Sequence, residues 1–114
     1  MASTATATAE QVQAEVEAWL DENWDPALSV RDWWRRLAGA GLSYPMMDAP
    51  FGRSYNRDQT AAVFAALRAK GAMGPPAGLG TMLAMPTILT YGTPEQIEQF
   101  VPAILDGSHG WCQL

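Results

Sequence analysis

The stretch Gly92-Thr93-Pro94-Glu95-Gln96 separates two helical segments of this 114-residue chain. Gly92 is suited to ending the first segment, because glycine is the residue that most often follows a helix C-terminus. Thr93 can cap the next helix with its hydroxyl, and Pro94 takes the first helical position, where no backbone N–H is needed. The stretch therefore predicts one helix on each side of it.

The segment before this junction, residues 79–91, is apolar around almost its whole circumference. Its polar side chains are threonines and one tyrosine, so it lacks the charged face of a solvent-exposed helix. Such a helix is normally buried or lines a cavity. Pro86 lies inside the segment and predicts a kink, because proline removes one backbone hydrogen bond and its ring collides with the carbonyl four residues earlier.

The segment after the junction is amphipathic, and Pro102 predicts an interruption near its end. Its apolar face consists of Ile97, Phe100, Val101 and Ile104. Residues 107–114 then have the pattern of a β-strand. A strand without a partner cannot satisfy its backbone groups. We therefore expect these residues to open a further, β-containing domain that continues beyond Leu114 and carries most of the protein's function.

Three more helices are predicted in the N-terminal part, at residues 9–23, 29–40 and 56–71. Ser29 can cap the second of them, and Asn56 with Gln59 forms a capping-box pattern at the start of the third.

The adjacent Trp33 and Trp34 cannot both lie at the centre of one apolar stripe, so one of them is predicted to pack at its edge or against a neighbouring element. Residues 41–57 are irregular but apolar, and we expect them to pack onto the helices.

The fold class predicted from these patterns is all-α, with about five helices leading into the first strand of a β middle domain. The expected division is a flexible tail at residues 1–9, a helical domain at 10–107 and the start of the β domain at 108–114.

The composition excludes several classes of protein. A net charge of −5 and a pI near 4.6 argue against a general nucleic-acid binder, which needs a basic stripe to release counterions. Arg31, Arg35 and Arg36 share one predicted helix and are interpreted as a solvated face, with a partner contact as the alternative. No segment has the pattern of a targeting signal or the length of a membrane span, so a soluble cytoplasmic protein is expected.

The single cysteine, Cys112, fits a reducing compartment. His109 is close in sequence, but three residues along a strand place the two side chains on opposite faces, so we expect a buried apolar thiol rather than a catalytic one. The sequence contains no set of catalytic residues, no metal-ligand cluster and no phosphate-binding glycine loop.

The second half of the chain combines several motifs in a fixed order. They are the apolar run from Gly74 to Leu89 with its internal proline, the Gly-Thr-x-Glu-Gln turn at 92–96, the step Val101-Pro102, the helix-ending Gly107 and the strand start Trp111-Cys112-Gln113-Leu114. Together they resemble the acyl-CoA dehydrogenase family, and most of all its actinobacterial members. Residues 33–38 and 41–45 resemble the second helix of that family and the loop that follows it. Residues 46–53 depart from the usual loop.

The resemblance implies an N-terminal helical domain followed by a β-barrel-like middle domain and a C-terminal four-helix domain, which together enclose FAD and an acyl-CoA thioester. The implied reaction is α,β-dehydrogenation to the trans-2-enoyl-CoA, with the catalytic base beyond Leu114 and no catalytic or metal-binding residue in this chain. The implied partners are an electron-transfer flavoprotein as electron acceptor and further subunits of a homo- or hetero-tetramer.

The resemblance also assigns binding residues. Gln113 and Leu114 match the start of the flavin-contacting strand, although an ordinary strand residue is the alternative. Gly78, Met82 and Met85 match the helix that lines the acyl-chain cavity, with a plain core helix as the alternative. The missing side chain of Gly78 would widen the cavity for a bulky acyl group.

Two other functions remain open at this point. One is that of a relative with the same fold, a flavin-dependent monooxygenase or nitroalkane oxidase. In the resemblance the catalytic base is a glutamate, and its presence or absence beyond Leu114 would distinguish the two. A helical interaction module without a cofactor would be a different class of protein altogether.

Overall fold

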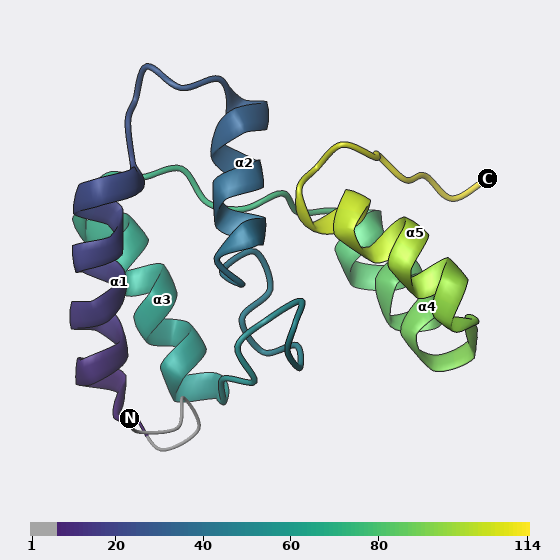
Figure 1. Ribbon diagram of the computed structural model, residues 1–114, viewed down its shortest axis with the longest axis horizontal. Helices are drawn as coiled ribbons and strands as arrows, with labels where there is room; N and C mark the ends of the chain where they lie inside the picture. The colour runs from purple at the N-terminus through teal and green to yellow at the C-terminus, as the bar shows by residue number, and fades with distance from the viewer. Residues whose placement is uncertain (1–6) are drawn as a thin grey trace.

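The computed structural model describes residues 7–114, and the regular secondary structure of this part of the chain is entirely helical (Figure 1). The elements are α1 (Ala9–Asn23), α2 (Val30–Gly39), α3 (Arg57–Ala69), the π-helix η2 (Gly80–Ala84), α4 (Met85–Tyr91) and α5 (Pro94–Leu105). The predicted all-α class with five α-helices is confirmed. Residues 1–6, most of the expected N-terminal tail, lie outside the described residues.

Three of the helices begin with a capping box. Asn56 and Gln59 form the predicted one, in which the Gln59 backbone N–H donates to Asn56 Oδ1 at 2.8 Å and the Asn56 backbone N–H donates to Gln59 Oε1 at 2.9 Å. The same reciprocal pair joins Thr8 to Gln11 and Thr93 to Gln96. Because each box satisfies backbone donors that a helix start leaves free, these three boundaries are fixed locally.

The first lobe consists of α1, α2 and α3. Helix α1 packs along α3, with α2 beside them (Figure 1). Their buried side chains form one core with Leu42 and Tyr55, two residues of the loop between α2 and α3. The members from the helices are Val12, Val16, Leu20, Trp33, Leu37, Ala62, Val63, Ala66 and Leu67.

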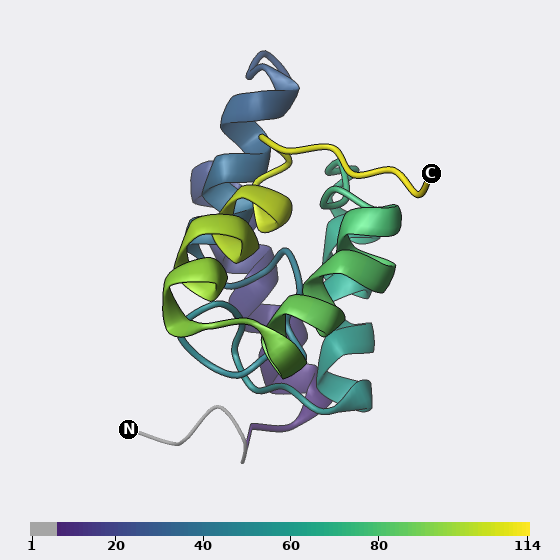
Figure 2. The ribbon, with the colours of Figure 1, turned by 90° about the vertical axis from the view of Figure 1, so that its right-hand side faces the viewer.

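The second lobe consists of η2, α4 and α5, which lie in front of the first lobe in Figure 2. Its core is the cluster of Met85, Val101, Ile104 and Leu105. Met47 and Phe51 of the loop between α2 and α3 pack against this cluster, as does Ala38 of α2. The prediction that the loop packs onto the helices is therefore confirmed, and the loop and α2 together join the two lobes.

Trp33 and Trp34 take different positions, as predicted. Trp33 is buried in the first core and its Nε1 donates to the carbonyl of Met73 at 2.8 Å. Trp34 is half-buried and its Nε1 donates to the next carbonyl, that of Gly74, at 2.9 Å. Both indoles therefore tie α2 to the connection between α3 and η2.

Pro86 and Pro102 both lie inside helical segments. Residues 80–91 are continuously helical, but the chain changes helix type just before Pro86. The kink predicted there stays a prediction. The Met85 N–H donates to the carbonyl of Gly80, five residues earlier, and Pro86 then occupies the first turn of α4. There its missing N–H costs little.

The predicted interruption at Pro102 is wrong, because α5 continues through it to Leu105. Pro102 is exposed, so the carbonyl that loses its donor can be hydrated. The neighbouring side chains of Val101 and Ile104 remain buried and hold the helix in place.

The chain leaves α5 at Gly107, whose φ of +73° is favourable only for glycine. A Cβ at this position would lie 2.7 Å from Cζ3 of Trp34 and closer still to Cε3, so Trp34 packs directly on the glycine. Residues 110–114 are extended but pair with no strand in the part of the chain described here. Their assignment as the start of a β domain stays a prediction.

Replacing Gly107 by alanine is expected to destabilise the full-length protein by about 3 kcal/mol, because left-handed strain adds to a collision with the Trp34 ring. The matched control is Gly71→Ala, where φ is +65° and an added Cβ meets no atom within 4 Å. That variant is expected to lose only about 1 kcal/mol from strain. Chemical denaturation followed by circular dichroism measures both, and equal losses would contradict the contact with Trp34.

Candidate functional site

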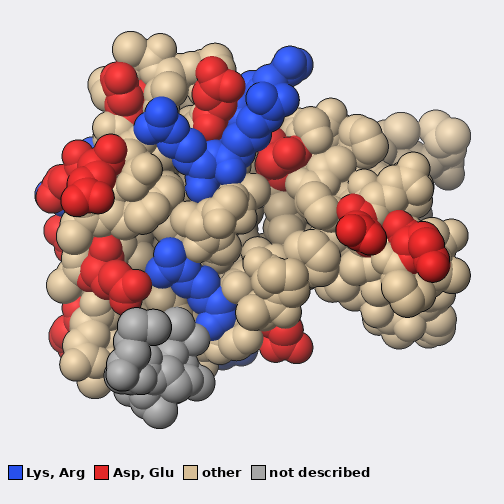
Figure 3. Space-filling view, in the orientation of Figure 1, with Lys and Arg blue, Asp and Glu red and all other residues tan. Residues whose placement is uncertain are grey.

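The outer face of η2 and α4 carries large apolar side chains in contact with solvent. Met82 is 70% exposed and Tyr91 84% exposed, and Leu79, Leu83 and Leu89 are exposed as well. This segment is predicted to be buried or to line a cavity. Met85 is buried next to α5, and other residues of the segment line a hollow: Leu79, Leu83, Ala84, Thr87 and Ile88. In the space-filling view the second lobe shows few charges on the visible face (Figure 3).

One hollow lies next to Gly78 and is called the Gly78 hollow here. Its volume is about 160 Å³, and residues 76–81 form one wall while Ile104 of α5 and residues 109–111 form the other. Gly78 has a φ of +139°, and a Cβ built there would meet no atom within 4 Å. The backbone conformation, rather than a lack of space, therefore accounts for glycine at this position.

A second hollow, the Gln113 hollow, has a volume of about 300 Å³. Residues of η2 and α4 form one wall and the terminal segment forms the other. The first wall consists of Leu79, Leu83, Ala84, Thr87 and Ile88, and the second of Trp111, Cys112 and Gln113. Thr87 donates its hydroxyl to the carbonyl of Leu83 at 2.8 Å, which satisfies the polar group of the first wall and leaves that wall apolar in character.

The residues assigned by the family resemblance are not brought together. Gly78 and Gln113 line separate hollows, whereas Met82 and Leu114 are exposed and line neither. Met85 is 1% exposed and belongs to the core of the second lobe.

Leu79, Leu83 and Trp111 are lining residues that the sequence analysis did not select. Leu79 and Trp111 line both hollows. Leu79, Leu83 and Thr87 are each four residues apart in the sequence, and this spacing places all three on one face of a helix. The spacing 78, 82, 85 selects a different face, and the π-helix further changes the angle between successive side chains.

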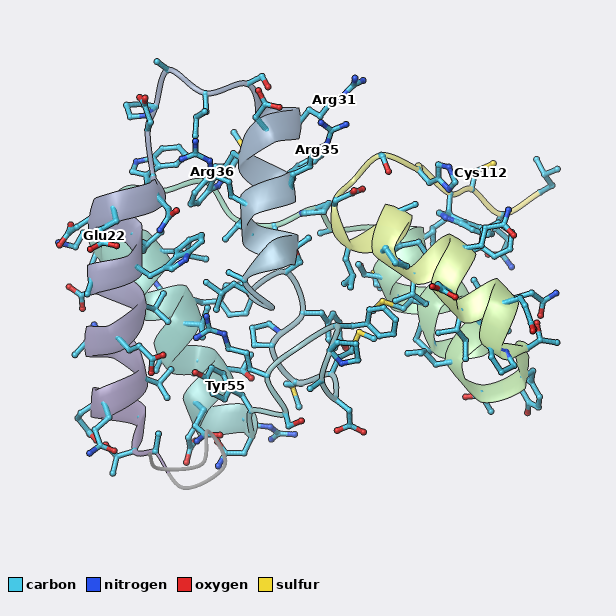
Figure 4. All side chains as sticks on the ribbon, in the orientation of Figure 1. Glu22, Arg31, Arg35, Arg36, Tyr55 and Cys112 are labelled. Carbon is cyan, nitrogen blue, oxygen red and sulfur yellow. The ribbon has the colours of Figure 1, made fainter. Side chains whose placement is uncertain are left out.

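Cys112 is exposed, so the prediction of a buried thiol is wrong (Figure 4). The reason is that the described chain covers only one side of the terminal segment. Arg31, Arg35 and Arg36 are exposed on α2, as a solvated face requires, and Arg36 Nη1 donates to the carbonyl of Asn23 at 2.8 Å.

Residues 7–114 contain no group of three or more His, Cys, Asp or Glu side chains that could hold a metal ion. No helix in the same part of the chain is long and apolar enough to cross a membrane.

Comparison with known proteins adds independent information. The family described as acyl-CoA dehydrogenase, N-terminal domain, matches residues 1–108. The acyl-CoA dehydrogenase FadE34 of Mycobacterium tuberculosis is 44% identical over 78 residues, which cover 68% of this chain and 11% of that protein. The acyl-CoA dehydrogenase IpdE1 of Mycolicibacterium smegmatis is 35% identical over 86 residues, or 73% of this chain and 21% of that protein.

The protein of the same name, IpdE1, from Mycobacterium tuberculosis is 27% identical over 91% of this chain and 32% of its own length. The chain thus spans between 11% and 32% of the length of these relatives. No solved structure gives a significant match.

Alanine substitutions of Met82 and Met85 distinguish a packed side chain from an exposed one. Met85→Ala is expected to cost about 2–4 kcal/mol of unfolding free energy, because it opens a cavity in the second core. Met82→Ala is expected to stay within about 0.5 kcal/mol of the wild type, because its side chain makes few contacts. Urea denaturation of the full-length protein measures both values. A loss at Met82 as large as that at Met85 would show that Met82 is packed.

Proposed function

This chain belongs to the acyl-CoA dehydrogenase family, and we propose that it is the N-terminal part of an FAD-dependent enzyme that converts an acyl-CoA thioester to the trans-2-enoyl-CoA. The match to the family over residues 1–108 carries the proposal. Its support from geometry is that two hollows, one beside Gly78 and one beside Gln113, open along the same apolar helix.

The Gln113 hollow fits one part of a flavin. Its η2–α4 wall is apolar, which suits the face of a planar ring system. The backbone groups of residues 110–114 make no hydrogen bond within the described part of the chain, so they are available to the polar edge of a ligand. The Gln113 amide can both donate and accept. We therefore assign Gln113, with the adjoining Leu114 backbone, to FAD binding.

FAD, when bound, supplies the acceptor for the hydride that leaves the β-carbon of the substrate. The contribution of this chain is to bind the cofactor and the acyl chain and to exclude water from them. The walls of both hollows include no carboxylate that could serve as the base. The base that removes the α-proton is proposed to lie in the part of the enzyme that follows Leu114.

The acyl chain is proposed to lie along η2, in the Gly78 hollow. Met82 extends this apolar surface, while Met85 supports it from the core. An electron-transfer flavoprotein as acceptor, a homo- or hetero-tetramer and a cytoplasmic location belong to the same proposal and derive from the family resemblance alone.

The visible absorption spectrum of the purified full-length protein tests the proposal. We expect the bands of oxidised flavin, and we expect them to bleach when acyl-CoA thioesters are added without an electron acceptor. A folded full-length protein that contains no flavin and binds none would reject the assignment as a dehydrogenase.

Substrate length tests the acyl surface. Ala77→Phe is expected to narrow the Gly78 hollow and to lower kcat/KM for long acyl-CoA substrates about tenfold relative to short ones, because Ala77 lines this hollow and not the Gln113 hollow. Leu89→Phe is the control, because Leu89 is exposed on α4 and lines neither hollow. The ratio of kcat/KM values for long and short substrates is the quantity compared. The same change of ratio in both variants would argue against an acyl chain in the Gly78 hollow.

A further inference from the structure

Trp111 occupies the boundary between the two hollows of the candidate site. Its indole lines the Gly78 hollow and the Gln113 hollow, and also a third hollow formed with residues 87–92, Gln96 and Phe100. The side chain is 37% exposed, so it has contacts on part of its surface and a free part that faces the hollows. The proposed acyl region and the proposed flavin region thus share this one wall.

Two contacts hold the indole in place. The ring of Phe100 on α5 meets it edge-to-face, with centroids 5.9 Å apart and planes at 80°. On the other side the indole lies against the backbone of η2 at Gly80. A Cβ at Gly80 would be only 3.2 Å from Cδ1 of Trp111 and 3.2 Å from Cγ2 of Ile104. A side chain at residue 80 would therefore require the indole or Ile104 to shift by a few tenths of an ångström.

Other attachments of the terminal segment end before Trp111. The Ser108 N–H donates to Asp106 Oδ1 at 2.8 Å, and the His109 N–H donates to the carbonyl of Ala103 at 3.1 Å. From residue 110 onward the described chain offers the segment no hydrogen bond. Within this lobe the aromatic contact and the contact with Gly80 therefore fix the course of the last residues.

We propose that Trp111 is a positioning residue, whose indole, held between Phe100 and the η2 backbone at Gly80, fixes residues 112–114 opposite α4. The consequence of this position for FAD binding rests on the proposed function. If Gln113 contacts FAD, then Trp111 sets the distance between that contact and the apolar wall at Leu83. The π-helix serves the same purpose, because it brings the bare backbone of Gly80 to the indole, and π-helical turns are frequent at functional sites.

Gly80→Ala is the informative variant, because it leaves the indole in the protein and takes away only the space that the indole occupies. Alanine in place of glycine usually stabilises a chain where the backbone conformation allows it. Loss of function in Gly80→Ala would therefore come from displacement of Trp111 or Ile104 rather than from a weaker helix. The companion variants are Trp111→Ala, which removes the ring, and Trp111→Phe, which keeps an aromatic ring beside Phe100.

The experiment uses the full-length protein and two readouts. Hydrogen exchange of the Ser108 and His109 amides, which donate hydrogen bonds to Asp106 and Ala103, reports whether the segment is held, with or without cofactor. Fluorescence titration of the FAD-free protein with FAD reports affinity. Trp111→Ala is expected to speed this exchange and to raise the FAD dissociation constant, each at least tenfold, and Gly80→Ala is expected to change both quantities in the same direction. Trp111→Phe is expected to recover most of both. Gly39→Ala is the control, because Gly39 lines neither hollow and its added Cβ meets no atom within 4 Å.

The outcomes separate this inference from the proposed function. Unchanged exchange in Trp111→Ala and Gly80→Ala would overturn the positioning role, whatever the wild type does with FAD. A Gly39→Ala variant that exchanges as fast as Trp111→Ala would overturn it too, since the effect would not depend on the indole. A wild type that binds no FAD, with exchange still accelerated in the two variants, would refute the dehydrogenase proposal and support the positioning of the segment.

Discussion

The two adjacent indoles of α2 are the constraint on which the arrangement of the molecule depends. Trp33 and Trp34 donate to the successive carbonyls of Met73 and Gly74, where the chain passes from the first lobe to the second. Trp34 also packs on Gly107, where the chain leaves α5. The entry and the exit of the second lobe are thus both attached to one side chain. A typical hydrogen bond contributes only about 1 kcal/mol to stability. The larger effect here is geometric, because α2 fixes both ends of a lobe whose own core is small.

That small core explains the character of the candidate site. Its buried residues are Met85, Val101, Ile104 and Leu105, so α5 covers one side of η2 and α4, while the terminal segment covers the rest of their surface only in part. Contiguous exposed apolar surface of this kind marks contacts with a ligand or with further protein. This observation agrees with a proposed acyl and flavin site on the same face, and with a chain that spans at most 32% of the length of the relatives compared.

The change from π-helix to α-helix connects the two proposals. Proline disfavours a regular α-helical turn before it, because its ring approaches the carbonyl four residues earlier. The α5 helix accommodates Pro102, whereas the turn before Pro86 is the wider π-helix η2, which ends two residues before this proline and presents Gly80 to Trp111. The segment that contains Pro86 thus helps to shape the wall of the candidate site.

The sequence alone determined the starts of the helices. Thr8, Ser29, Asn56 and Thr93 satisfy backbone donors within three residues of themselves, so no distant contact is needed to place these boundaries. It also determined the family, because the motifs at residues 74–114 keep their order and spacing regardless of how the lobes pack.

Only the tertiary structure decided which side chains are accessible. Met82 and Met85 are three residues apart and chemically identical, yet one is exposed and the other buried, because Met85 packs into the cluster with α5 and Met82 does not. For the same reason the exposure of Cys112, the continuity of α5 through Pro102 and the place of Trp111 between Phe100 and Gly80 did not follow from local patterns. Burial depends on contacts between residues distant in sequence, and those contacts exist only once the lobes are assembled.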